Sequence, residues 1–369
     1  MNHSKEQILK AANAFALKGQ IKSCRVYGSG HINHTFFLIC EENGQEYSYI
    51  LQQINHIVFK DIEGLMQNIK KVTLFLRHQI IENHGNPDRE TLNLIPTKNG
   101  KNYYQDSEGY YWRVYLFISH ATCYNKVEKP EDFYQVGKAF GKFQCLLENF
   151  PADELVETIP NFHNTPARFV TFQNVVEKDV MGRASQVQKE IHFIREREKE
   201  MSLALSLQKQ GKLPLRVSHN DTKLNNIMID DTTRQALCII DLDTIMPGFS
   251  IFDYGDSIRF GANTAKEDEK DLSKVSLSLP LFEIYTKGFL EGSKGRLKEV
   301  EIELLPYGAK MMTLECGMRF LTDYLEGDIY FHVSKKEHNL DRCRTQLALV
   351  ADIEKKWTDM KTIIQKYKN

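Results

Sequence analysis

The chain has 369 residues, of which 41% are hydrophobic and 26% are charged, a balance that excludes collagen-like, coiled-coil and wholly disordered proteins. This length predicts two domains or one large two-lobed enzyme, since single domains usually have roughly 100 to 200 residues. The 48 basic and 49 acidic residues leave a formal net charge of -1, so no overall positive field would attract nucleic acid. We therefore expect an anionic ligand to bind at a local site.

The first third of the chain has the pattern of a small antiparallel sheet with one helix. Segments rich in β-branched and aromatic residues predict strands at 21–27, 34–40, 46–52, 92–96 and 110–118. Residues 41–44 form a hairpin turn signal between the second and third strands. After Asp61, a helix N-cap, apolar residues recur at helical spacing as far as Ile80, which predicts a helix that lies on the sheet.

The remaining two thirds of the chain predicts mainly helices. Apolar residues between 133 and 143 mark one helix, and the highly charged run 183–210 predicts a longer one. Residues 226–230 and 236–241 are two short apolar strands joined by a polar turn, which predicts a hairpin among the helices. A sheet region followed by a helical region does not by itself define a function.

The densest group of polar residues is the segment HNDTKLNN at 219–226, which leads into the first strand of this hairpin. Phosphoryl transfer requires a carboxylate that orients the attacking hydroxyl and accepts its proton, and a nearby oxygen ligand that binds magnesium. Asp221 and Asn226, five residues apart on one loop, are suited to these two roles. The alternative is a helix-to-strand turn whose Asn and Asp side chains only satisfy loop backbone groups.

A second acidic group follows the next strand, in the segment IIDLDT at 239–244. A carboxylate that ends a buried strand is costly unless it is paired or binds a metal ion. Asp241 lies twenty residues after Asp221 and across a hairpin from it, so both carboxylates are expected in one cleft. Asp253 and Asp256 follow closely, and we interpret them as residues that cap a helix or brace the loop.

Together, HNDTKLNN and IIDLDT resemble the catalytic and metal-binding motifs of the aminoglycoside phosphotransferase and choline kinase superfamily, which shares the bilobal fold of protein kinases. The resemblance implies that Asp221 is the catalytic base. It implies that the magnesium ligands are Asn226 and Asp241, with Asp243 as an additional residue near the metal. It also implies that two residues brace the catalytic loop, His219 and Asp256.

On this resemblance we expect an α+β, bilobal, protein-kinase-like fold. Residues 1–116 would form the N-terminal nucleotide-binding lobe, an antiparallel sheet with one helix. Residues 117–369 would form the larger, mainly helical lobe that carries the catalytic and acceptor-binding residues. The hinge near Phe117 and Ile118 is expected to contact the adenine of ATP.

Three further segments are similar to the N-acetylhexosamine 1-kinases: GSGHINHTFF at 28–37, YILQQIN at 49–55 and ECGMRFLTDYLEGDIYF at 315–331. The similarity spans nearly the whole chain. These enzymes phosphorylate the anomeric hydroxyl of free N-acetylglucosamine or N-acetylgalactosamine. The resemblance therefore implies ATP and Mg2+ as cofactors and a sugar as the acceptor, with Arg319 and Tyr330 in contact with the sugar.

The glycine-containing segment after the first strand is by itself typical of a plain turn. At the tip of the first hairpin of a kinase-like lobe, the backbone N–H groups of Gly28, Ser29 and Gly30 would instead approach the nucleotide phosphates. The side chains of His31 and Asn33 would then reach the same ligand.

One departure from the protein-kinase pattern concerns the strand at 49–53, which lacks the lysine that pairs with the nucleotide phosphates. Gln52 or Gln53 stands in its place, and the hexosamine kinases that the chain resembles lack that lysine too. The sequence therefore leaves open which residue pairs with the α- and β-phosphates of the nucleotide. Glu63, early in the predicted helix, is interpreted as a surface acid that interacts with the helix dipole.

Arg319 and Tyr330 also have structural interpretations. The block around Arg319 is too continuously apolar for a surface helix, and an arginine in a buried helix needs a partner. Asp323 is a candidate for that partner, which would make Arg319 part of a core ion pair. Tyr330 would then only close a turn over the core.

The sequence therefore predicts an ATP-dependent N-acetylhexosamine 1-kinase. One alternative is a kinase for a cationic acceptor, an aminoglycoside or choline, which would call for carboxylates or an aromatic cage in the acceptor pocket. The balanced charge of the helical region counts against it. Another alternative is a nucleotide-binding pseudokinase scaffold, which the presence of all three metal-site residues disfavours.

Cysteine usage and the N-terminus bear on the location of the protein. The 7 cysteines form no paired metal-ligand spacing, and an odd, scattered set favours reduced thiols and a cytoplasmic protein. The N-terminus has helical spacing and lacks the apolar core of a signal peptide, and no segment approaches the roughly 18 apolar residues of a membrane span. We expect no membrane or nucleic-acid partner, and a monomer or weak dimer.

Overall fold

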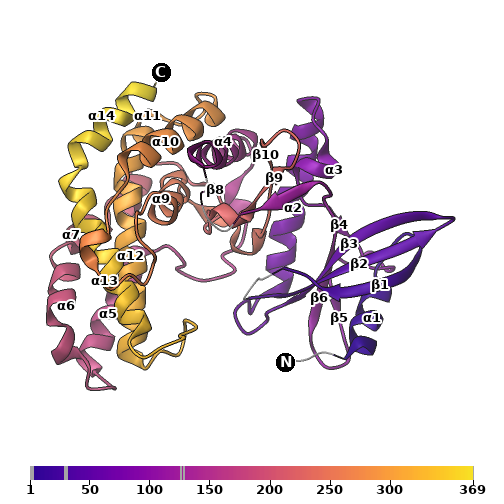
Figure 1. Cartoon of the computed structure of the whole chain (residues 1–369), viewed down its shortest axis with the longest axis horizontal. Helices are drawn as coiled ribbons and strands as arrows, with labels where there is room; N and C mark the ends of the chain where they lie inside the picture. Colours follow the sequence, from indigo (N-terminus) through magenta and orange to yellow (C-terminus); the bar gives the residue numbers. More distant parts are fainter. Residues whose placement is uncertain (1–3, 29–31, 125–126, 128, 369) are drawn as a thin grey trace.

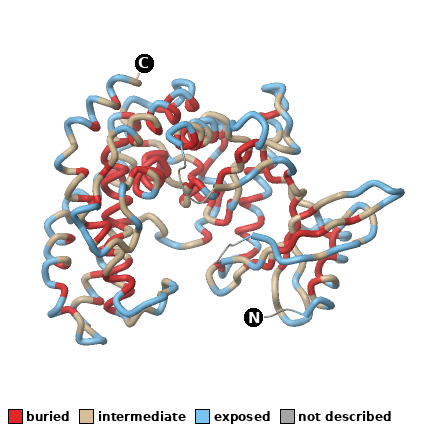
Figure 2. The backbone as a smooth tube through the Cα atoms, viewed as in Figure 1, coloured by how far each residue is buried: buried red, intermediate tan, exposed pale blue. Residues whose placement is uncertain are grey.

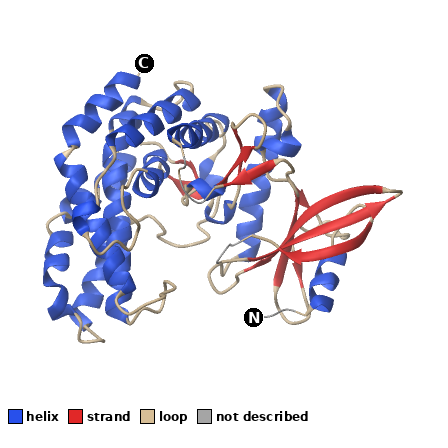
Figure 3. Cartoon of the chain, viewed as in Figure 1, coloured by secondary structure: helices blue, strands red, loops and turns tan. Residues whose placement is uncertain are grey.

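The computed structural model describes residues 4–28, 32–124, 127 and 129–368. Strands gather in the N-terminal third and helices dominate the remainder, so the chain has a sheet lobe and a larger helical lobe (Figure 1, Figure 3). This is the two-lobed α+β arrangement that the sequence predicts. No helix within the described ranges is both long enough and apolar enough to cross a membrane.

The N-terminal lobe is built on one antiparallel sheet with the order β1-β2-β3-β6-β4, in which β5 also pairs with β6. Its strands are β1 (Gln20–Val26), β2 (His34–Glu42), β3 (Gln45–Ile54), β4 (Leu94–Ile95), β5 (Tyr104–Gln105) and β6 (Tyr111–Leu116). The predicted strands are confirmed with shifted ends, and β5 is an addition. Asn43 and Gly44 have positive φ angles of 53° and 79°, as the predicted hairpin turn requires.

The two faces of this sheet pack against different helices. Leu51 and Trp112 belong to a small core under α1 (Lys5–Asn13), and the opposite face packs against α2 (Ile62–Glu82). The prediction of one helix in this lobe is therefore wrong, because α1, α2 and a short α3 (Pro87–Glu90) are all present. An antiparallel sheet with two apolar faces needs cover on both sides, and the amphipathic N-terminal segment supplies the second cover.

Helix α2 connects the two lobes. Asp61 caps it, accepting the backbone N–H of Gly64 at 2.9 Å, which confirms the predicted N-cap. In the middle of the helix the buried Asn68 donates from Nδ2 to the carbonyl oxygens of Val156 (2.8 Å) and Ile245 (3.0 Å). Because both acceptors belong to the helical lobe, α2 is bonded to the segment that follows Asp241.

The helical lobe contains the residues that follow β6. Its helices are α4 (Pro130–Leu146), α5 (Thr165–Lys178), α6 (Gln188–Arg195), α7 (Glu198–Met201), α8 (Leu203–Lys209), α9 (Ser250–Gly261), α10 (Leu279–Ser293), α11 (Glu299–Glu303), α12 (Leu305–Glu326), α13 (His338–Lys355) and α14 (Trp357–Tyr367). Its short strands are β7 (Ala121–Cys123), β8 (Arg216–Ser218), β9 (Ile227–Asp230), β10 (Ala236–Ile239) and β11 (Met246–Gly248). The predicted hairpin is present as β9 and β10, and β7 adds a third strand to it.

The sequence predicts one long helix over the charged run 183–210, but the structure has three short helices there, α6, α7 and α8. At the first break Arg197 donates from its side chain to the carbonyl of Phe193 (2.7 Å), the group that its own backbone N–H would bond in a continuous helix. The same guanidinium pairs with both carboxylate oxygens of Glu354 on α13, at 2.9 and 2.7 Å. An ion pair between residues far apart in the sequence therefore ends the helix. Sequence periodicity does not reveal such a contact.

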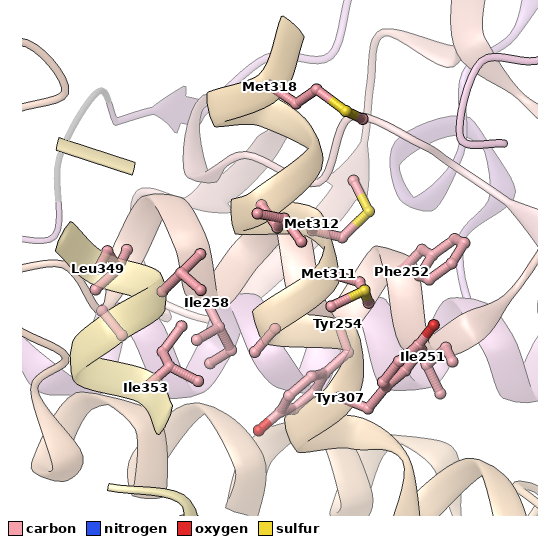
Figure 4. Close-up of a cluster of buried hydrophobic side chains, with 14 of the residues drawn as sticks. Ile251, Phe252, Tyr254, Ile258, Tyr307, Met311, Met312, Met318, Leu349 and Ile353 are labelled. Carbon is pink, nitrogen blue, oxygen red and sulfur yellow. The ribbon is translucent and has the colours of Figure 1, made fainter. Parts of the chain in front are cut away.

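The core of the helical lobe lies where α12 packs against α9 and α13. Ile251 and Tyr254 of α9 face Met311 of α12 in this cluster (Figure 4). A Cβ atom on Gly255 would lie 2.3 Å from the carbonyl oxygen of Gly308, so only glycine permits this approach of the two helices. Buried residues follow the inward sides of the helices and exposed residues their outer sides (Figure 2). This packing sets the position of α12 relative to α9.

Candidate active site

The loop at 219–226 connects β8 to β9 and is braced from α9. Asn220 has a φ of 64°, which is uncommon for a residue with a side chain and persists only where its surroundings hold it. Asp253 holds it here, because its carboxylate accepts the backbone N–H groups of His219 (2.9 Å) and Asn220 (2.8 Å). The interpretation of Asp253 as a brace is confirmed.

His219 ties this loop to the strand that precedes Asp241. Its buried ring has Nε2 2.9 Å from the carbonyl oxygen of Ile240 and Nδ1 3.3 Å from the backbone nitrogen of Asp221. Because the carbonyl accepts and the amide donates, the ring carries its proton on Nε2. One imidazole therefore links the backbones of the segments that carry Asp221 and Asp241.

The Asp221 carboxylate has two partners on its own loop. Its Oδ1 lies 2.6 Å from Nζ of Lys223, and its Oδ2 accepts from Nδ2 of Asn226 at 3.1 Å. Burial would lower the pKa of Lys223, but Asp221 and Asp256 outweigh this effect and raise the pKa, so the lysine is cationic. Asn226 turns its amide nitrogen toward Asp221, which leaves its Oδ1 without a hydrogen bond to the described residues.

Asp241 follows β10 in a left-handed backbone conformation, with φ and ψ both 58°. The backbone N–H of the preceding Ile240 donates to the carbonyl of Asn226 at 2.9 Å, which places the two segments side by side. Desolvation raises the pKa of Asp241 to about 7, and the carboxylates of Asp243 and Asp221 contribute to the shift. Asp241 is nevertheless an exposed residue.

A magnesium ion fits the oxygen groups that meet here. The carboxylate of Asp241 and the free Oδ1 of Asn226 are hard ligands, and Mg2+ is usually held by one or two carboxylates together with substrate phosphates and waters. The described ranges contain no group of three or more His, Cys, Asp or Glu suited to a metal. An ion at this place would use the nucleotide phosphates as further ligands.

Asp243 is bonded by residues of the N-terminal lobe. Its Oδ1 accepts from Arg113 of β6, and its Oδ2 accepts from Nδ2 of Asn33 at 2.6 Å. Both oxygens of this buried carboxylate thus have protein donors. Its role as a metal-site residue stays a prediction.

Asp256 forms no hydrogen bond to the described residues of the catalytic loop, on which it acts only through its charge near Lys223. Its Oδ1 accepts from Nε (2.9 Å) and NH2 (2.8 Å) of Arg259, one turn further along α9. Burial would raise the pKa of Asp256, but Arg259 and Lys223 lower it. The prediction for Asp256 is corrected because Asp253, three residues earlier and one turn closer to the loop, performs the bracing.

The predicted phosphate loop follows β1. Gly28 has a φ of 76° with open space around it. Three predicted residues lie outside the described part of the chain: Ser29, Gly30 and His31. Asn33 donates to Asp243 and accepts the backbone N–H of Asn55 at 2.9 Å. The end of this loop is therefore directed toward the segment that carries Asp241.

Aromatic rings gather beside the predicted hinge. The ring of Phe117 lies edge-on to those of Phe37 (4.8 Å between centroids) and Tyr27 (6.0 Å). The side chain of Ile118 is buried, and its backbone N–H donates to none of the described residues. An aromatic surface next to a free backbone donor is suited to adenine.

A pocket of about 120 Å3 lies on α12 and the segment that follows it. Arg319 and Tyr330, the two predicted sugar contacts, meet there. The guanidinium carbon of Arg319 lies 5.8 Å from the ring centroid of Tyr330, 5.5 Å from that of Phe331 and 5.3 Å from that of Phe162. The pocket is lined by Arg168, Thr171, Met318, Arg319, Thr322, Asp323, Glu326, Tyr330 and Phe331.

The alternative of a core ion pair between Arg319 and Asp323 is wrong. Asp323 accepts four hydrogen bonds, three from the backbone N–H groups of residues 329–331 and one from Asn339. Its carboxylate thus holds the segment that carries Tyr330. Arg319 forms no hydrogen bond or ion pair with the described residues. Tyr330 is 62% exposed and does not close the core.

Sequence reasoning missed His163, which joins this pocket to the catalytic loop. Its Nδ1 lies 2.7 Å from Glu315 of α12, one turn before Arg319, and its Nε2 lies 3.2 Å from the carbonyl oxygen of Asn220. Both partners accept, so both ring nitrogens donate and the ring is cationic. Burial alone would lower the pKa of His163, but Glu315 outweighs it and raises the pKa. A lone histidine in a loop carries no sequence signal for this contact.

Arg113 was also missed, although a charged residue inside an apolar strand was a usable signal. It lies directly opposite Gln52 in the sheet, and its Nε and NH2 donate to Oε1 of Gln52 at 3.0 and 2.9 Å. Gln53 lies opposite Trp112 and therefore on the other face. Glu63 is exposed and accepts from Tyr103 and Gln67, which confirms its interpretation as a surface acid.

Known proteins share this fold. An aminoglycoside phosphotransferase from Alicyclobacillus acidocaldarius superposes with a TM-score of 0.60 at 11% identity and covers 99% of this chain and 98% of its own. A choline kinase from Cryptosporidium parvum gives 0.57 at 14% identity, with 96% and 97% covered. A spectinomycin phosphotransferase in complex with ADP and spectinomycin gives 0.57 at 14% identity, with 94% and 98% covered.

The sequence itself matches a family model. Residues 23–272 match the model of the phosphotransferase enzyme family, a stretch that includes the sheet, the catalytic loop and Asp241. The structural neighbours, at 11% to 14% identity, show the fold alone. Since the family match extends over more than half of the 369 residues, the chain belongs to the phosphotransferase enzyme family.

Proposed function

We propose that the chain is an ATP-dependent N-acetylhexosamine 1-kinase that phosphorylates the anomeric hydroxyl of N-acetylglucosamine or N-acetylgalactosamine. One observation carries this proposal: the guanidinium of Arg319 has no hydrogen bond to the described residues and lies in an aromatic pocket joined to the catalytic loop. A guanidinium donates readily to hydroxyl and ring oxygens, and the ring of Tyr330 can pack against the apolar face of a sugar. The resemblance of residues 315–331 points to the same side chains.

The residues that line this pocket carry balanced charge, which does not favour a cationic acceptor. Structural neighbours are named as kinases for aminopropanol, ethanolamine and choline. A cage of aromatic rings is a common site for such cations, but here Arg319 occupies the space among the rings. Arg168 lies close enough for Arg319 to lower its pKa, in addition to the larger effect of burial. The lining contains two arginines, Arg168 and Arg319, and two acids, Asp323 and Glu326, and this balance suits a neutral acceptor rich in oxygen.

In the proposed reaction Asp221 orients the anomeric hydroxyl and accepts its proton as the γ-phosphoryl group is transferred. Lys223, 2.6 Å from Asp221, holds the carboxylate in place. Asn226 and Asp241 would hold Mg2+, which when bound neutralises the charge of the nucleotide phosphates. His163 and Glu315 keep the acceptor pocket in register with the backbone beside Asp221.

The nucleotide would bind to the N-terminal lobe, which we propose to extend over residues 1–116. Gly28 and the loop that follows it would approach the phosphates. The rings beside Phe117, with the free N–H of Ile118, would take the adenine. The remaining residues, 117–369, would carry the acceptor and the catalytic groups.

The test is ADP release from ATP and Mg2+ with a panel of acceptors: N-acetylglucosamine, N-acetylgalactosamine, glucose, galactose, choline and an aminoglycoside. We expect turnover with the N-acetylhexosamines and formation of the sugar 1-phosphate, identified by phosphorus NMR. N-acetylglucosamine methylated at the anomeric oxygen is the matched control, and it should be inert. Preferred turnover of choline or the aminoglycoside would overturn the proposal.

A further inference from the structure

A buried polar cluster joins the two lobes beside the metal-site residues. It consists of Arg113 and Gln52 on the sheet, Asn33 after the phosphate loop, and Asp243 in the helical lobe. Its side chains are shielded from solvent: that of Arg113 is 1% exposed and that of Asp243 is 4% exposed. Charged groups are rarely buried to this extent unless each has a partner, and here each one has.

Arg113 is held from two directions. Gln52 accepts from its Nε and NH2, and Asp243 accepts from its NH1, so at least three of its five N–H groups are used. Gln52 is itself oriented by Thr35, to whose hydroxyl it donates at 3.1 Å. A guanidinium that is buried and held in this way does not reach a nucleotide directly. It acts through the carboxylate that it holds.

That carboxylate is placed between two functional segments. Asp243 lies two residues after Asp241, and its second oxygen accepts from Asn33 at 2.6 Å. Asn33 in turn accepts the backbone N–H of Asn55 at 2.9 Å, at the end of β3. A single side chain of the helical lobe is thus bonded to the strand that carries Arg113 and to the end of the phosphate loop.

We propose that Arg113, Asp243 and Asn33 form an inter-lobe latch that holds the start of β2 against the segment carrying Asp241. In this latch Arg113 is a positioning residue, and it supplies the buried positive charge that β3 lacks, since Gln52 faces the site where a lysine would be expected. Asp243 belongs to the latch and not to the metal ligands. The inference rests on nucleotide phosphotransfer and is independent of the identity of the acceptor.

The test compares Arg113→Met, Asp243→Asn and the double variant with Tyr115→Phe as the matched control. Tyr115 follows Arg113 by two residues on the same strand, and its buried hydroxyl has no hydrogen-bond partner among the described residues. Arg113→Lys is included as a conservative variant, since it keeps the charge and loses the fork that spans Gln52 and Asp243. The measurements are ADP binding with Mg2+ by calorimetry, kcat, KM for ATP and for the acceptor, and the melting temperature.

We expect Arg113→Met and Asp243→Asn each to lower kcat/KM for ATP at least tenfold, with KM for the acceptor changed less than twofold. The double variant should lose no more of its kcat/KM for ATP than the more impaired single variant, because both substitutions disrupt the same ion pair. Hydrogen exchange at the amide of Asn55 should accelerate in both single variants, since Asn33 loses its anchor, and should stay unchanged in Tyr115→Phe. Arg113→Lys should fall between wild type and Arg113→Met.

Two outcomes would overturn the latch. In one, Asp243→Asn abolishes Mn2+ binding to the ADP-bound protein while Arg113→Met leaves it intact, which would make Asp243 a metal ligand. In the other, the variants lower the melting temperature while the folded protein keeps wild-type kcat and KM for ATP. ADP binding and Asn55 exchange need no acceptor, so they report on the latch even if the proposed sugar is wrong.

Discussion

The phosphate side and the acceptor side of the site differ in their charged groups. On the phosphate side, desolvation and the neighbouring carboxylates of Asp243 and Asp221 raise the pKa of Asp241. On the acceptor side, Arg319 and Arg168 share a pocket with aromatic rings. The first arrangement attracts a metal ion, and in the second the arginines are balanced by the acids Asp323 and Glu326. Carboxylates that suit a metal ion can thus stand beside a pocket of balanced charge.

Removal of the base tests the phosphate side most strongly. We expect Asp221→Asn to lower kcat by about 10² to 10⁴-fold, the usual contribution of a general base, because the amide cannot accept the proton. Binding of ADP with Mg2+ should change less than threefold, since Asp221 acts on the acceptor. Steady-state kinetics and calorimetry measure the two effects, and near-normal kcat in a folded variant would rule out Asp221 as the base.

Removal of the proposed metal ligand should have the next largest effect. Asp241→Ala deletes the carboxylate beside Asn226, and we expect kcat to fall by about a hundredfold or more at every Mg2+ concentration. Asp231→Ala is the control, because Asp231 is an exposed carboxylate in the turn of the same hairpin. Unchanged Mg2+ dependence in Asp241→Ala would show that another group holds the ion.

The acceptor side is tested by Arg319→Lys, which keeps the charge and loses paired donation. Loss of one or two such hydrogen bonds should lower kcat/KM for the sugar by about ten- to a hundredfold and leave KM for ATP unchanged. Arg344→Lys is the control, since Arg344 pairs with Glu190 away from the pocket. A fall in melting temperature with an unchanged KM for the sugar would instead assign Arg319 to the scaffold.

The smallest expected effect is on the pH dependence of stability without Mg2+. Between the ordinary aspartate value of about 3.9 and the raised pKa of about 7, folded Asp241 holds a proton that the unfolded chain has lost, so its contribution to stability falls as pH rises. Asp241→Asn should therefore gain stability relative to wild type between pH 5 and pH 8. Because the side chain also contacts solvent, we expect only about 1 kcal/mol, or a few degrees in melting temperature. If the stability difference between Asp241→Asn and wild type in EDTA were the same at pH 5 and pH 8, the raised pKa of Asp241 would be contradicted.

Local patterns in the sequence predicted the strands of the sheet, the hairpin β9–β10 and the loop that carries Asp221 and Asn226. These features depend on alternation, helical spacing and turn residues, which act over a few neighbouring positions. The spacing of Asp221 and Asp241 across one hairpin is local in the same sense. It placed the two carboxylates in neighbouring segments before any packing was known.

Packing decided the partners of the charged groups. Arg113 and Asp243 are 130 positions apart, and His163 and Glu315 are 152 apart. Asp253 braces the loop while Asp256 pairs with Arg259, although both acids lie on one helix and are equally plausible from the sequence. A buried charge takes whichever partner the packed elements bring within reach, because solvent no longer competes. Composition and periodicity determine which segments become buried, and only the tertiary contacts between them determine which charges meet.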